Sequence, residues 1–147
     1  MKLSKLTRFA SISLLLLACS GVSAAELAVI INPKNPSADL TVLEIKQLYL
    51  KNNTHWGNGK KVRPAALNYE ADIATDFYKS VLSMTVTEVE RHWIEVQYGK
   101  ALKPPVQLDD SEAVIKFVGK FKGAVGFVEV GAVDGHKKVK VLRVISF

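Results

Sequence analysis

The chain has 147 residues, and its 20 Lys and Arg against 14 Asp and Glu give a formal net charge of +6. Three of the bases are Lys2, Lys5 and Arg8; without them 17 bases face 14 acids, and the net charge falls to +3. A surplus this small does not supply the clustered bases that a nucleic-acid backbone needs, so we expect no nucleic-acid partner. With 48% hydrophobic and 23% charged residues, the composition is typical of one folded domain and excludes a disordered or multispanning chain.

The beginning of the chain has the three regions of a secretory signal peptide. Bases end at Arg8, an apolar stretch covers Phe9–Ala18, and small residues precede Ala24. The apolar stretch is too short to span a bilayer. We predict a signal peptide over residues 1–24 and one domain over 25–147, without a transmembrane helix in the mature chain and with a periplasmic location.

A second interpretation of the leader involves its one cysteine. The run from Leu16 to Cys19 resembles the lipobox of bacterial lipoproteins, in which the cysteine becomes the acylated first residue. The alternative location is therefore a lipoprotein anchored at Cys19. If Cys19 is removed with the leader, the mature chain holds no cysteine, which excludes a disulfide, a thiolate metal ligand and a cysteine nucleophile.

The first elements of the mature chain have clear boundaries. Residues 27–31 form a short apolar run that ends at the rigid loop 32–36, a pattern that predicts a buried strand. Thr41 with Glu44 forms a capping box before apolar residues at helical spacing, so we expect a helix from there to about Leu50.

The rest of the chain alternates between strand and helix patterns. Thr87 with Glu90 is interpreted as a second capping box, and Asp109 or Asp110 as a cap for the last helix. The further predicted elements are a strand at 62–67, helices at 71–83, 87–99 and 111–122, an extended segment at Pro104-Pro105, and strands at 124–130 and 139–145.

This order predicts an α/β domain with a mixed sheet of about four to five strands and about four helices packed on it. In such sheets, ligands lie beyond the carboxyl ends of strands. The rule points to the loop Asn32–Ser37 and to the turn Leu67–Asp72.

No arrangement of residues in the sequence indicates catalysis. Glu88, His92 and Glu95 stand at i, i+4 and i+7 and could present one face to a metal ion, but a solvated polar face is the favoured interpretation. The pair Asp109-Asp110 is more typical of a helix cap than of a catalytic dyad. We expect no enzyme, no cofactor and no metal site.

Several separated segments resemble one family, the phosphate-binding periplasmic proteins of ABC uptake systems, and especially their short single-domain relatives. The resemblance covers nearly all of the mature chain. The matching pieces are Val29-Ile30-Ile31-Asn32-Pro33-Lys34-Asn35-Pro36, Leu40-Thr41 with Ile45–Leu50, Trp56-Gly57-Asn58-Gly59, Phe77–Leu82, Trp93, Tyr98-Gly99-Lys100, Pro104-Pro105 and Gly123-Ala124-Val125-Gly126-Phe127-Val128.

The resemblance implies a lobe of the type 2 periplasmic-binding-protein fold, export, no catalysis, and an oxyanion held by amides and hydroxyls at a helix start. Longer members carry an arginine and a Ser-Gly-Thr there, whereas this chain reads Asn68-Tyr69-Glu70-Ala71-Asp72. Longer members also close two lobes around the ion, whereas 147 minus 24, or 123, residues build one.

We therefore predict a small-anion site that combines the two loops at the strand ends. Asn68 and Thr75 would supply side-chain contacts, residues 71–73 amide donors, and Lys34 positive charge. The predicted ligand-binding residues are Asn32, Lys34, Asn68, Ala71, Asp72, Ile73 and Thr75.

Two functional hypotheses follow from these observations. In the first, the protein binds phosphate or a related small oxyanion for ABC-type uptake or sensing. In the second, it is an accessory or signalling partner of an envelope sensor, porin or transporter and binds no small ligand. A homodimer or another partner chain would help to bury an anion that one lobe leaves half hydrated.

Overall fold

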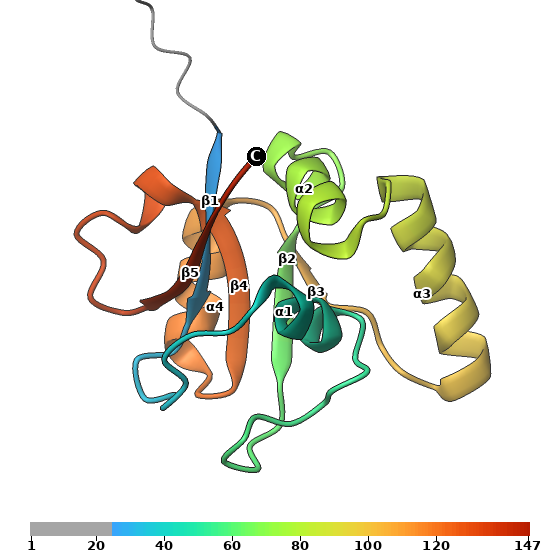
Figure 1. Ribbon diagram of the computed structural model, residues 1–147, viewed down its shortest axis with the longest axis horizontal. Coiled ribbons are helices and arrows are strands. Elements are labelled where there is room, and N and C mark those ends of the chain that lie inside the picture. Colours follow the sequence, from blue (N-terminus) through green and yellow to red (C-terminus); the bar gives the residue numbers. More distant parts are fainter. Residues whose placement is uncertain (1–24) are drawn as a thin grey trace, which may run out of the picture.

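The computed structural model describes residues 25–147, so the predicted signal peptide and Cys19 lie outside the described residues. One mixed sheet runs through the domain in the strand order β3-β2-β4-β1-β5 (Figure 1). The strands are β1 Glu26–Ile31, β2 Arg63–Leu67, β3 Val106–Leu108, β4 Ala124–Glu129 and β5 Lys140–Ser146.

Helices cover both faces of this sheet, which confirms the predicted α/β class. α4 packs on one face, α1 and α2 pack on the other, and α3 stands beside the sheet (Figure 1). Within residues 25–147, no helix is long and apolar enough to cross a membrane. The helices are α1 Val42–Tyr49, α2 Asp72–Phe77 with its π-helical continuation Tyr78–Leu82, α3 Val86–Lys100 and α4 Ser111–Lys120, and a 3₁₀ turn covers Val130–Val133.

Strand direction decides which loops share an end of the sheet. β1 runs antiparallel to β4, with Ile31 opposite Val125, whereas β2 runs parallel to β4, with Arg63 opposite Ala124. The carboxyl end of β1 therefore lies beside the amino ends of β2 and β4. The loops that follow β1 and β2 leave opposite ends of the sheet.

An aromatic cluster fastens α1 and α2 to the sheet. The rings of Phe77 and Phe127 stack with centroids 3.9 Å apart, and Tyr49 meets Phe77 edge-on at 4.6 Å. The Tyr49 hydroxyl donates to the Ala65 carbonyl at 2.8 Å, so the ring is buried with its polar atom satisfied. Burial raises the pKa of Tyr49 well above its ordinary value, and it also raises the pKa of Tyr78.

Two elements differ from the sequence-based expectation. β3 was not predicted as a strand, because it has only three residues, directly after Pro104-Pro105, and this run is too short to show a strand period. It lies at the edge of the sheet. The capping box of α3 uses Thr85 and Glu88, so the predicted box at Thr87 and Glu90 is wrong. Left-handed Ser83 (φ 57°) ends the preceding π-helix early enough for α3 to begin at Val86.

The buried tyrosine predicts how stability depends on pH. A tyrosine whose folded pKa exceeds its unfolded pKa of about 10 keeps its full contribution below pH 10 and loses it as pH rises toward the folded pKa. Tyr49→Phe should cost about 1–2 kcal/mol at pH 7, because the buried Ala65 carbonyl loses its donor. The free energy of unfolding of Tyr49→Phe should fall less steeply above pH 10 than that of the wild type, because the variant has no hydroxyl to ionise at this position.

Urea denaturation from pH 7 to pH 11 measures both effects. Tyr98→Phe is the matched control, because Tyr98 is 90% exposed and its replacement should change neither value. Equal alkaline slopes for Tyr49→Phe and the wild type would contradict the assignment.

Candidate ligand-binding site

Asn32 directly follows β1, and its side chain has a structural role. Its side chain is buried, and its Nδ2 donates to the carbonyls of Val118 and Gly119, both at 3.0 Å. Its Oδ1 accepts from the Lys34 amide at 2.9 Å. Asn32 therefore satisfies carbonyls near the end of α4, which a helix leaves without partners of its own, and its polar atoms are already engaged.

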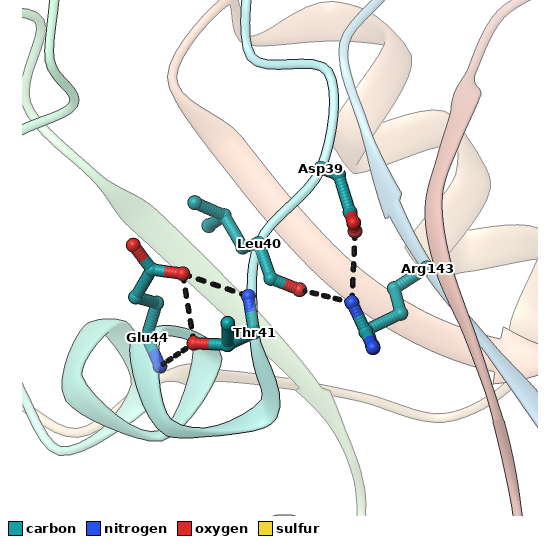
Figure 2. Close-up of polar contacts among 5 residues, drawn as sticks. All are labelled: Asp39, Leu40, Thr41, Glu44 and Arg143. Carbon is teal, nitrogen blue, oxygen red and sulfur yellow. Dashed lines mark hydrogen bonds and ion pairs between the residues drawn. The ribbon is translucent and has the colours of Figure 1, made fainter.

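The loop after Asn32 is fastened to β5. Lys140 Nζ donates to the carbonyls of Asn35 and Ser37, both at 2.8 Å. Arg143 donates to the Leu40 carbonyl at 2.8 Å and pairs with Asp39 at 3.0 Å, as Figure 2 shows. These bonds hold the loop in place, while the Lys34 side chain points into solvent.

Of the four α-helices in residues 25–147, three close their amino ends with side chains of their own cap residues. At α1, the Thr41 hydroxyl accepts from the Glu44 amide, while Glu44 Oε2 accepts from the Thr41 amide at 2.7 Å (Figure 2). Hydrogen bonds from the amide and then the hydroxyl of Thr41 hold the pKa of Glu44 below its ordinary value. α3 has the same arrangement, and Asp110 accepts from the Ala113 amide at α4. An external anion finds few free donors at these three helix starts.

The start of α2 is different, because its N-cap residue Ala71 supplies no side-chain acceptor. The turn before it is closed by the Ala71 amide, which donates to the Asn68 carbonyl at 3.1 Å. Asn68 Oδ1 accepts from the Glu70 amide at 3.2 Å. Within the described chain, the amides of Asp72 and Ile73 have no acceptor and remain available for one.

Two tyrosines lie close together beside this turn. The rings of Tyr69 and Tyr78 are 5.9 Å apart. Burial raises the pKa of Tyr69, and the negative charge of Glu90 adds to the effect. Both hydroxyls are therefore neutral at physiological pH and able to donate a hydrogen bond.

Acidic side chains surround the start of α2. A cavity of about 360 Å³ beside it is lined by Glu26, Asp72, Asp76 and Glu129, and no basic residue contributes to its lining. Four carboxylates without a cation give this cavity a negative potential that opposes a bound anion. No set of three or more His, Cys, Asp and Glu in the described part is arranged to hold a metal ion.

The structure divides the predicted site into two parts. Asn68, the start of α2 and Thr75 lie on one turn and its helix, whereas Asn32 and Lys34 lie at the other end of the sheet. The expectation of one combined site is wrong, because β1 runs antiparallel to β4 and β2 runs parallel to it. The prediction also missed Glu26, Asp76 and Glu129; Glu26 and Glu129 meet there only through antiparallel pairing, which the sequence does not reveal.

Comparison with known proteins gives a clear result for the fold. No family model and no curated protein matches the chain. The solved structures with a similar fold include an ABC-type phosphate transport receptor from Vibrio cholerae, with a TM-score of 0.64, 18% identity and coverage of 81% of this chain and 46% of that one.

A phosphate ABC transporter substrate-binding protein from Clostridium perfringens, solved with bound phosphate, has a TM-score of 0.61 and 19% identity over 81% of this chain and 45% of that one. PstS from Borrelia burgdorferi gives a TM-score of 0.61 at 11% identity, with 81% and 47% covered. The chain thus spans less than half the length of these neighbours. It shares the fold of one lobe of a substrate-binding protein.

The bonds of Asn32 predict a purely structural phenotype. Asn32→Ala should lower the free energy of unfolding by about 2–3 kcal/mol, because buried carbonyls of α4 lose their donor. Lys34→Ala is the control on the same loop and should change stability by less than about 0.5 kcal/mol, since that side chain is exposed. Urea denaturation of the two variants measures the difference, and equal stabilities would disprove the capping role.

Proposed function

We propose that the protein is an exported, non-catalytic binding module that takes phosphate or a related small oxyanion at the turn between β2 and α2. The observation that carries the proposal is the open start of α2. Its amides at Asp72 and Ile73 are free, on a fold shared with phosphate-binding transport proteins. A helix start with free amides favours an anion through hydrogen bonds and through the helix dipole.

The same site limits the affinity. Asp72 and Asp76 stand on α2 itself, and their carboxylates repel the ligand that the amides attract. The turn is also open to solvent, because one lobe covers only one side of a bound ion. We therefore expect millimolar binding by the isolated chain, and tighter binding only where a second copy or an envelope partner covers the site.

Two substitutions at Asp72 separate the contribution of its backbone amide to phosphate binding from that of its carboxylate. Asp72→Asn removes the charge and keeps the amide, so phosphate should bind roughly threefold to tenfold more tightly at low salt. Asp72→Pro removes both, and proline is tolerated at a first helical position after an extended residue such as Ala71 (ψ 129°). The proline variant should bind phosphate more weakly than the asparagine variant.

Calorimetric titration with phosphate, sulfate and acetate measures these affinities, with Glu95→Gln on α3 as a charge-matched control. If neither the wild type nor any of the three variants gives a binding heat at millimolar phosphate, the proposal is wrong. Equal affinities of the asparagine and proline variants would show that the amide takes no part.

The second candidate function is an accessory or signalling role in the envelope, without a small ligand. Two observations favour it: the acidic cavity opposes anions, and Ile94 and Tyr98 on α3 expose 58% and 90% of their surfaces. These two side chains lie one helical turn apart and offer a small apolar contact for a partner protein.

A pull-down from envelope extracts, with and without phosphate, distinguishes the two candidates. The accessory role predicts a complex with a partner protein that added phosphate does not change. The double substitution Ile94→Ser and Tyr98→Ser should disrupt this complex. The first candidate predicts that phosphate alters any complex formed.

A further inference from the structure

A groove with the opposite charge lies at the other end of the sheet. A cavity of about 340 Å³ and its neighbour of about 490 Å³ share Lys51, Lys61 and Lys103, and Arg63 lines the second. We call this surface the basic groove and define it by these four cations. It lies between the α1–β2 loop and the α3–β3 connection, at the amino end of β2, whereas the turn proposed for phosphate follows the carboxyl end of β2.

Within the described residues, no anionic group balances the positive charge of the groove, although Arg63 lies over the ring of Phe121 at 4.8 Å. No carboxylate lines either cavity, and none of the four cations forms an ion pair with another described residue. Partial burial, followed by the charges of Lys61 and Lys103, lowers the pKa of Lys51. A bound anion would relieve this repulsion.

Apolar side chains make up most of the remaining surface. Val62, Leu102, Val106 and Phe117 contribute to the two cavities between the cations. Ligand pockets typically enclose about 300–1,000 Å³, with a mainly apolar lining and a few well-placed polar groups. The basic groove matches this description for a ligand that has both a charged head and an apolar body.

The walls of the groove are fixed by local structure. Lys51 (φ 55°) and Ala101 (φ 52°) hold the left-handed conformation that non-glycine residues rarely adopt, one on each wall. On the first wall, the Val62 amide donates to the Thr54 carbonyl at 2.9 Å. Trp56 Nε1 donates to the Gly123 carbonyl at 2.9 Å and anchors the same loop to the start of β4. These hydrogen bonds hold the backbone of the first wall in place without a ligand.

We propose that the basic groove binds an anionic lipid, with the phosphate headgroup held by Lys51, Lys61 and Lys103 and the acyl chain against the apolar lining. The geometry favours a lipid over a nucleic acid, because the four cations line two adjoining cavities together with apolar side chains, whereas a nucleic-acid backbone needs cations along an extended face. It favours a lipid over free phosphate, because the apolar lining gains nothing from an inorganic ion. This site is independent of the function proposed above.

The test uses soluble lipids below their critical micelle concentrations, measured by calorimetry with the purified protein. Dihexanoyl phosphatidic acid should bind at least about tenfold more tightly than dihexanoyl phosphatidylcholine or inorganic phosphate, because it alone offers an uncompensated charge with an acyl chain. Equal affinity for the two lipids would overturn the proposal, as would equal affinity for phosphate and phosphatidic acid. Equal binding of a hexaglutamate peptide would assign the groove to an acidic protein segment instead.

Substitutions locate the binding on the chain. Lys61→Gln and Lys103→Gln should each weaken phosphatidic acid binding at least about fivefold, whereas Lys79→Gln, an exposed lysine of the π-helix, should not. Near-identical melting temperatures for the three variants would confirm that each is folded. Unchanged affinity in both groove variants would disprove the site. Asp72→Asn should leave lipid affinity unaltered. The lipid site and the proposed phosphate site can therefore be disproved independently of each other.

Discussion

The antiparallel pairing of β1 with β4 is the constraint on which the arrangement of the molecule depends. Leu27–Ile31 are 0% exposed, and β1 lies between β4 and β5 in the sheet. A strand buried on both faces has little freedom to change register or direction. Its direction sends the loop at Asn32 to one end of the sheet and leaves the β2–α2 turn at the other.

The two ends of the sheet differ in charge, because carboxylates lie at one end and lysines at the other. Glu26 and Glu129 line one cavity together with the acids of α2, while Lys51, Lys61 and Lys103 line cavities at the opposite end. The overall charge of residues 25–147, 17 bases against 14 acids, conceals this separation. The acidic end explains why a small anion should bind only weakly at α2, and the basic end offers a stronger field to a different kind of anion.

Local features of the fold could be predicted from the sequence, whereas features that depend on strand direction could not. The capping box of Thr41 and the cap of α4 are contacts within four residues; the first was predicted, and the second was predicted as Asp109 or Asp110, of which Asp110 forms it. The predicted box at Thr87 and Glu90 was wrong, because Thr85 and Glu88 have the same spacing in Thr-Val-Thr-Glu-Val-Glu and the folded chain uses that pair, two residues after left-handed Ser83. The acidic cavity and the basic groove each combine segments far apart in the sequence, so no local sequence pattern could predict them.

Amide resonances of the ¹⁵N-labelled protein provide the most direct test of the claim that the two ends of the sheet act separately. Titration with phosphate should shift the amides of Asp72 and Ile73, titration with a short-chain phosphatidic acid should shift residues around Lys51 and Lys103, and neither should move Asn32. Parallel shifts at both ends with a single ligand, or a phosphate response centred on Asn32, would contradict the account.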